Sequence, residues 1–214
     1  GKEEVLPIFL ASRDWKPGQP DVPTASSGPI AIYRSPELPS GYLEVALTLP
    51  AGQDRVGLLA AITGTLAAHD LSIQAAEIRT QEDGAIADRF WVIPAGPRAP
   101  PADEELASQL AQRFARALED PASIILPPLA QRGQPGTIPA TVFFNGPVNG
   151  RTELTVLSQE RNRPGLLYVI AKTFAEQGIN TEGLLGLDSF TVTKEGRPLT
   201  PDEQAALQQA LVAL

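Results

Sequence analysis

Two short segments of the chain have residue types suited to holding a small charged molecule. Asp54 precedes Gly57 by three positions, Asn162 precedes Gly165 by the same spacing, and an apolar helical pattern follows each glycine. A helix N-terminus presents unpaired backbone N–H groups and a partial positive charge, which suit a carboxylate. An Asp or Asn side chain beside it can accept a hydrogen bond from an ammonium group. The pattern therefore predicts two sites for a molecule that carries both groups.

The candidate binding residues are those of the two loops and of the first helical turns that follow. In the first loop they are Asp54, Val56, Gly57, Leu58 and Leu59, and in the second they are Asn162, Arg163, Gly165, Leu166 and Leu167. The apolar members would contribute their backbone amides, and glycine would let a ligand approach the backbone closely. An alternative interpretation makes Asp54 and Asn162 ordinary N-caps and leaves the glycines to the turn alone.

The composition excludes most other chemistry. The 214 residues contain no Cys and one His, which excludes disulfides, thiolate nucleophiles, iron–sulfur clusters and multi-histidine metal sites. No phosphate-binding glycine loop or hydrolase motif occurs. We therefore predict no catalytic residue, no metal and no cofactor. His69 is expected at the end of a helix, where a cation would complement the helix dipole.

The charge and hydropathy pattern limits the class of partner. The formal net charge is −8, whereas nucleic-acid binding requires a basic patch. No apolar run approaches the roughly 18 residues of a membrane span, and no signal-peptide pattern is present. The sequence thus predicts a cytoplasmic protein without nucleic-acid or membrane partners. The complete absence of Met is unusual for a natural protein of this length and leaves two alternatives, a fragment of a longer chain or a free-standing protein.

An internal repeat organises the chain. Residues 54–59 read DRVGLL and 162–167 read NRPGLL, an offset of 108, whereas 88–92 (DRFWV) and 188–192 (DSFTV) differ by 100. The second copy is therefore eight residues shorter between its first helix and the later strand. Residues 183–187 are too few for both a complete strand and a turn, which predicts a segment missing there, with a real deletion as the alternative.

Each copy has the same predicted order of elements: two strands, an amphipathic helix, a hairpin and a second helix. Thr200, Pro201 and Glu203 form a capping-box pattern that starts the last helix. Units of this kind give an α+β fold, here two ferredoxin-like modules, each an antiparallel sheet with two helices on one face. The two units could also pack into one continuous sheet. The expected elements lie at 29–33, 42–49, 58–69, 72–79, 85–93 and 103–118 in the first copy, and their counterparts begin at 140 and 152 in the second.

The prolines and glycines predict the domain boundaries. A Pro-rich N-terminal arm is expected over 1–29, a first module over 30–126, a linker over 127–138 and a second module over 139–214. Most of the 21 prolines fall in the arm, the linker and loops.

These motifs resemble the ACT domains, ferredoxin-like small-molecule sensors of amino-acid metabolism. The resemblance is closest to the tandem ACT pair at the C-terminus of the bacterial PII uridylyltransferase/uridylyl-removing enzymes, over 30–126 and 139–214. It implies an amino-acid ligand, glutamine by analogy, allosteric regulation, a homodimer and a protein partner in nitrogen regulation. The catalytic domains of those enzymes have no counterpart in this sequence.

Two hypotheses of function follow. The first is a non-catalytic sensor that binds a small amino acid at the strand-to-helix loops and passes this state to a partner or a catalytic region. The second is an ACT-type dimerisation or interaction module whose ligand sites are degenerate. An enzyme is disfavoured because catalytic motifs are missing.

Overall fold

The computed structural model describes residues 22–127, 140–158 and 164–214. Within these ranges, nine antiparallel strands form one sheet in the order β1-β2-β3-β5-β4-β8-β9-β7-β6. The strands of the first module are β1 (Ala25–Ser27), β2 (Ile30–Tyr33), β3 (Leu43–Leu49), β4 (Leu71–Thr80) and β5 (Ile86–Pro94). Those of the second are β6 (Thr141–Val148), β7 (Arg151–Leu157), β8 (Ile179–Gly186) and β9 (Ser189–Lys194).

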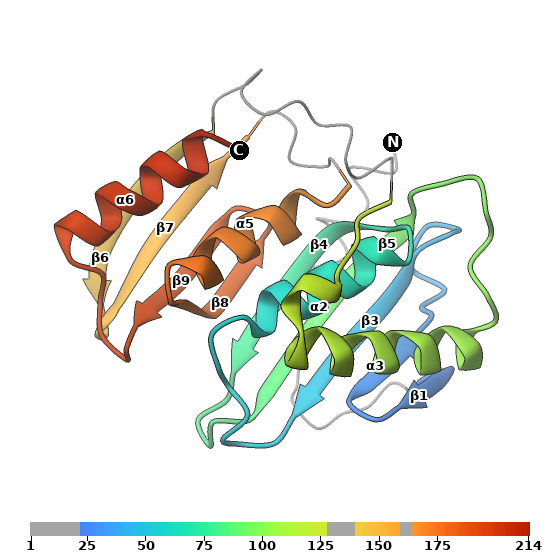
Figure 1. The fold of residues 1–214 in the computed structure, drawn as a ribbon. Helices are drawn as coiled ribbons and strands as arrows, with labels where there is room; N and C mark the ends of the chain where they lie inside the picture. The colour runs from blue at the N-terminus through green and yellow to red at the C-terminus, as the bar shows by residue number, and fades with distance from the viewer. Residues whose placement is uncertain (1–21, 128–139, 159–163) are drawn as a thin grey trace.

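Four α-helices of the described residues cover one face of this sheet (Figure 1). The first module contributes α2 (Leu58–Ala68) and α3 (Asp103–Glu119), followed by the 3-10 turn η1 (Pro121–Ser123). The second contributes α5 (Leu166–Glu176) and α6 (Pro201–Val212). The predicted α+β fold of two ferredoxin-like modules is confirmed. Among the described residues, no helix combines the length and apolar character needed to cross a membrane.

The two modules are joined through equivalent edge strands. Strand β4 pairs antiparallel with β8, with Ala76 opposite Gly186 and Arg79 opposite Gly183. Backbone hydrogen bonds therefore run from one module into the next without a break, because each strand satisfies the open edge of the other. The expectation of one continuous sheet is confirmed.

Helix α2 is buried on all sides because both modules cover it. It packs on β4, α3 and α5, and nine of its eleven residues are buried. A helix that is apolar around its whole circumference requires such an environment. The two buried hydroxyls are satisfied within the helix: Thr63 donates to the Leu59 carbonyl and Thr65 to that of Ala61, both at 2.7 Å.

Gly64 lies at a close contact between the helices of the two modules. A Cβ built on this residue would lie 2.8 Å from Cε2 of Tyr168, which belongs to α5, and 3.1 Å from Cγ1 of Ile124. Tyr168 is buried at this contact. The missing side chain therefore provides the space that the aromatic ring fills.

The hairpin of the second module corrects one prediction. Residues 183–187 complete strand β8 and supply the start of a tight turn, after which β9 begins at Ser189. Leu185 pairs with Ser189, and Gly186 takes a positive φ of 71°. The prediction that this segment is too short was wrong because the hairpin is shortened at its tip and loses no strand.

The N-terminal region and the linker are only partly described. Residues 1–21 and 128–139 lie outside the described residues, as do most of the predicted arm and linker. Residues 25–27, which the sequence assigns to the arm, instead form β1, which pairs with β2. β1 also contacts α3. Because of β1, the described part of the first module has one strand more than that of the second.

The N-termini of α6 and α3 have different side-chain hydrogen bonds. The capping box predicted for α6 is confirmed: the Thr200 hydroxyl accepts from the Glu203 backbone N–H, and the Glu203 carboxylate accepts from that of Thr200. At the start of α3, Asp103 accepts from Nε and Nη2 of the Arg34 guanidinium, both at 2.9 Å, and from the Thr24 hydroxyl. This second arrangement joins the start of α3 to Thr24, just before β1, and to Arg34, just after β2.

Candidate functional site

The first predicted site lies in the loop between β3 and α2, and a contact with the end of α3 holds this loop. The Arg55 guanidinium donates to the Leu118 carbonyl at the end of α3, at 3.1 Å. Asp54 is half-buried, whereas Val56 is 42% exposed. The side chains of Leu58 and Leu59 are buried in the core, so these two residues offer only their backbone to a ligand.

Glycine, and not the aspartate, occupies the N-cap of α2. Gly57 has φ 92° and ψ −6°, a left-handed conformation that other residues rarely adopt, and no side chain caps the helix. The interpretation of Asp54 as an ordinary N-cap was therefore wrong. No atom lies within 4 Å of a Cβ built on Gly57, so the space beside this turn is open.

Backbone N–H groups remain available at this helix start. The amide of Leu58 donates to the Arg55 carbonyl at 3.3 Å. Within the described part of the chain, the amides of Val56, Leu59 and Ala60 have no hydrogen-bond acceptor. Unpaired amides at a helix N-terminus are suited to an anionic group such as a carboxylate.

The Asp54 side chain points across the boundary between the modules. Its Oδ2 accepts a hydrogen bond from Nδ2 of Asn180 in β8, at 3.0 Å. Its negative charge also acts on Asp88 in β5, which is only 3% exposed. Burial raises the pKa of Asp88 well above its usual value, and the Asp54 charge raises it further, whereas the backbone N–H of Arg79 opposes both effects.

Sequence reasoning missed Asn180 and Asp88 as members of this site. The DRFWV motif contains Asp88, but its position in the repeat gave no indication that the carboxyl is buried near Asp54. Asn180 carries no motif, and it lies 126 residues from Asp54. Its position at the start of β8, beside the junction of the modules, is a consequence of the β4–β8 pairing.

The second predicted site is described only in part. Asn162 and Arg163 lie outside the described residues. Gly165 is the N-cap of α5 with φ 82° and ψ −5°, again without a side-chain cap, and Leu166 and Leu167 are buried. The two loops therefore share their helix-start geometry at the residues that can be compared.

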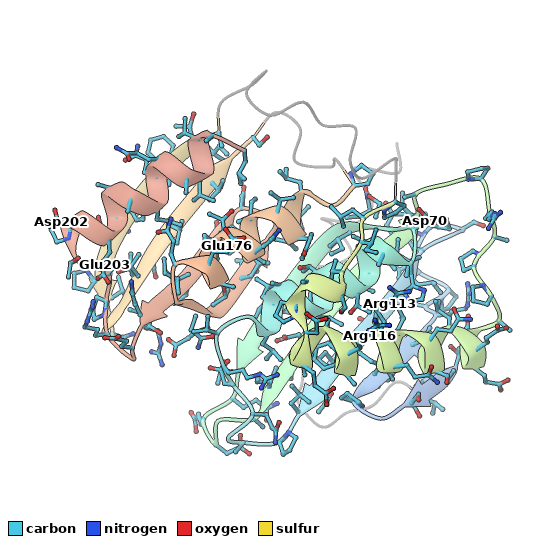
Figure 2. All side chains as sticks on the ribbon, viewed as in Figure 1. Asp70, Arg113, Arg116, Glu176, Asp202 and Glu203 are labelled. Carbon is cyan, nitrogen blue, oxygen red and sulfur yellow. The ribbon has the colours of Figure 1, made fainter. Side chains whose placement is uncertain are left out.

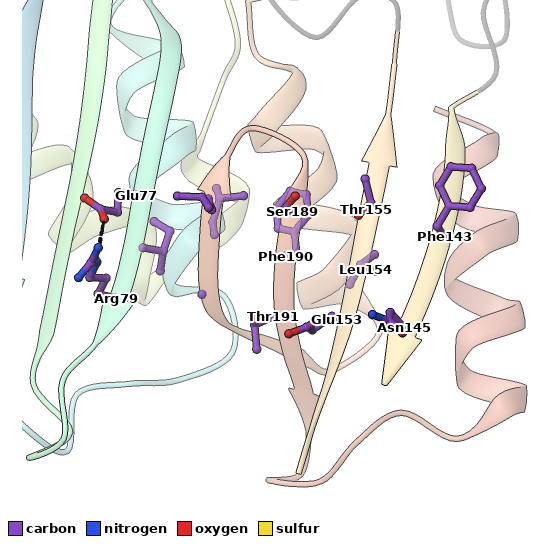
Figure 3. A pocket seen from close by; sticks show the side chains of 14 residues that line it. Glu77, Arg79, Phe143, Asn145, Glu153, Leu154, Thr155, Ser189, Phe190 and Thr191 are labelled. Atoms are coloured by element: carbon purple, nitrogen blue, oxygen red, sulfur yellow. Dashed lines mark hydrogen bonds and ion pairs between the residues drawn. The ribbon is translucent and has the colours of Figure 1, made fainter. Parts of the chain in front are cut away.

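A hollow of about 440 Å³ lies on the face of the sheet that the helices leave open (Figure 3). It spans the module boundary, with Glu77 and Arg79 of β4 on one side and Phe143 of β6 on the other. The Arg79 guanidinium donates to the Glu77 carboxylate. Phe143 and Leu185 are 55% and 68% exposed, so apolar surface lies at the rim.

Comparison with known proteins defines the class. Residues 51–112 match the model of the ACT domain, a segment that contains the β3–α2 loop and Asp88. Residues 51–112 of the first module thus match an ACT domain, and the second module repeats the order of elements of the first.

The same comparison finds relatives along most of the chain. They are bifunctional uridylyltransferase/uridylyl-removing enzymes, 27% identical over 79% of this chain in Streptomyces coelicolor, 31% over 80% in Xanthomonas oryzae pv. oryzae, and 26% over 87% in Vibrio campbellii. The resemblance predicted from the two motifs is confirmed. The aligned region covers 22%, 20% and 22% of those enzymes, so the chain spans about a fifth of their length.

Among solved structures, the aspartate kinase from Synechocystis aligns with 80% of this chain and 40% of its own, at 12% identity and a TM-score of 0.26. A TM-score of this size carries no argument about fold or function.

Proposed function

We propose that this chain is a non-catalytic regulatory sensor that binds a small amino acid at the β3–α2 loop, with glutamine as the ligand suggested by its relatives. The ligand carboxylate would bind the amides at the start of α2, and its ammonium group would bind Asp54. The second loop, from Asn162 to Leu167, would form the equivalent site. Asp54 carries the proposal because it combines the expected chemistry with a contact to the other module.

The contact with Asn180 supplies a mechanism for passing on the bound state. A ligand ammonium would bind the same carboxylate that holds Asn180 across the boundary. Ligand binding would therefore be coupled to the relative stability of the module arrangement, and a ligand shifts such an equilibrium by its differential affinity for the two states. A catalytic region or a protein partner in nitrogen regulation would respond to this arrangement, with modules at 30–126 and 139–214 acting as the sensing unit in the cytoplasm.

A ligand screen tests the proposal. Thermal unfolding of the full 214-residue chain is measured with each of the twenty amino acids, and isothermal titration calorimetry follows for those that raise Tm. A ligand at 100 times its Kd stabilises by about 2.7 kcal/mol. Absence of a shift with every amino acid, glutamine included, would refute the sensor hypothesis.

Variants assign the site. Asp54→Ala should weaken the response at the first loop, and Asn162→Ala tests the second. Glu82→Ala is a matched control because Glu82 is an exposed acid at the tip of the β4–β5 hairpin. Equal loss of binding in Asp54→Ala and Glu82→Ala would indicate a general charge effect and contradict the assignment.

The open face of the sheet favours a second candidate function, an ACT-type dimerisation or interaction module with degenerate ligand sites. Exposed Phe143 and Leu185 beside the hollow are the supporting observation. Sedimentation of the wild-type chain and of the Phe143→Ser/Leu185→Ser double variant tests a homodimer on this face. A change from dimer to monomer supports it, and an unchanged mass contradicts it.

A further inference from the structure

A basic cleft lies at the opposite end of α2 from the loop just described. It is lined by His69, Gln109, Gln112, Arg113 and Arg116, and its volume is about 380 Å³. Figure 2 shows Arg113 and Arg116 on the side of α3 nearest to α2. The eleven-residue helix places this cleft roughly 16 Å from the β3–α2 loop, so the two features are separate.

The two arginines of the cleft have no acidic partner within residues 22–127, 140–158 and 164–214. Among the described residues, neither the Arg113 nor the Arg116 guanidinium forms an ion pair or a hydrogen bond, although the chain has a net charge of −8. Arg34, Arg151 and Arg197, by contrast, each bind a carboxylate. An unpaired pair of guanidinium groups in one cleft is a site of positive potential on an otherwise acidic protein.

The positive charge in the cleft affects the pKa of His69. Burial lowers the pKa of His69, and the positive charge of Arg113 lowers it further, while the neighbouring Asp70 opposes both. His69 does end α2, as predicted. The lowered pKa favours the neutral imidazole at pH 7, which argues against its expected role as a cation for the helix dipole. Its Nε2 is buried without a hydrogen-bond partner among the described residues.

The cluster is not a requirement of the fold, because the described part of the second module has no equivalent at the end of α5. Gln177 ends α5 as His69 ends α2, and its Nε2 donates to the Ala206 carbonyl at 3.5 Å. The buried Leu207 and Leu211 of α6 can be aligned with the buried residues of the same spacing on α3. In this alignment Ala210 and Ala213 occupy the positions of the two arginines. Among the described residues, this basic cluster therefore occurs at the end of α2 and not at the end of α5.

The geometry points to a binding site for the phosphate group of a small molecule. Two guanidinium groups provide forked donors that match phosphate oxygens and its double negative charge. Gln109 and Gln112 each use one side-chain donation within α3, to Glu105 and Ser108, and retain a second amide proton for a ligand. The cleft volume lies within the range of about 300–1,000 Å³ typical of small-molecule sites.

The single histidine makes the test specific to this site. The Cε1–H proton resonance of His69 is followed by NMR in the full chain, during titration with inorganic phosphate or with adenosine monophosphate at constant ionic strength. Adenosine serves as the phosphate-free control. We expect a saturable shift with both phosphate compounds, none with adenosine, and a higher His69 pKa in the bound state, because the anion offsets the charge of Arg113.

Variants separate the cleft from general charge effects. Arg113→Gln/Arg116→Gln should weaken phosphate binding at least tenfold, whereas Lys172→Gln should leave it within about twofold, since Lys172 is an exposed cation of α5. A circular dichroism melt of each variant verifies that it is folded. Absence of a saturable shift up to about 10 mM phosphate, or an equal affinity in the double arginine variant, overturns the inference. Neither result depends on the amino-acid screen.

Discussion

The carboxylate of Asp54 and the carboxamide of Asn180 form a hydrogen bond of 3.0 Å between the two modules. Asp54 lies in the loop before α2, and Asn180 lies near the start of β8, 126 residues later in the chain. The bond thus places a ligand-loop residue of one module in direct contact with an edge strand of the other. A change in the charge or position of this carboxylate therefore acts directly on the contact between the modules.

Asp54 and Asn180 should be energetically coupled. A double-mutant cycle of Asp54→Ala and Asn180→Ala, measured by urea denaturation, should give a coupling free energy of about 0.5–1.5 kcal/mol, the usual net value of such a bond. The pair Glu82→Ala and Asn180→Ala is the control and should be additive. A coupling indistinguishable from that of the control pair would show that the contact contributes nothing in solution.

Asp88 should make stability fall as pH rises. Its folded pKa is raised, so between the unfolded value near 3.9 and the folded value the native state binds more protons than the unfolded state. Stability is therefore lost as pH rises through this interval, by about 1.4 kcal/mol for each unit of the shift. Asp88→Asn should lose less stability between pH 4 and pH 7 than the wild type, because its amide does not titrate. The amide oxygen can still accept from the Arg79 N–H.

Asp103→Asn provides a control of opposite sign. The hydrogen bond from Arg34 lowers the pKa of Asp103, so its contribution is present above the unfolded pKa and is lost as pH falls through the folded pKa. Asp103→Asn should destabilise the chain at pH 7, while Asp88→Asn should stabilise it. The same sign for both variants would contradict the assigned causes.

Gly64→Ala should weaken the packing between α2 and α5. Alanine normally stabilises a helix interior by about 1 kcal/mol relative to glycine. Here its Cβ would lie 2.8 Å from the buried Tyr168 ring, and overpacking of a core typically costs about 1–3 kcal/mol. We expect net destabilisation in the wild-type background and net stabilisation in a Tyr168→Leu background, measured by thermal unfolding. A stabilising effect in both backgrounds would exclude a tight contact.

Thr200→Ala should destabilise α6 by about 1 kcal/mol, because the Glu203 backbone N–H loses its acceptor. Thr200→Ser retains the hydroxyl and should remain close to the wild type in urea denaturation. Arg197 holds the pKa of Glu203 well below its usual range, mainly through a side-chain hydrogen bond. The capping box should therefore persist throughout mildly acidic conditions. Equal losses of stability in Thr200→Ala and Thr200→Ser would show that the hydroxyl has no capping role.

Much of the local structure was predictable because it depends on nearby residues. The repeat, the alternation of strand side chains and the Thr200 capping box all act within a few positions, and each prediction is confirmed. The sequence indicates the helix-start glycines but leaves two interpretations of Asp54 open, and the structure decides against the N-cap because Gly57 occupies that position. The shortened hairpin was misjudged, because an offset between repeats does not show where along a strand pair the residues are lost.

The sequence by itself determined the two-module α+β fold, the ACT resemblance and the loops most suited to a ligand. Only the tertiary structure decided that β4 and β8 join the modules, that Asn180 meets Asp54, and that Asp88 is buried beside them. It also brought the arginines of α3 to the end of α2. The physical reason is that local patterns specify helices and strands, whereas contacts between distant residues depend on which strand edges and helix faces satisfy each other.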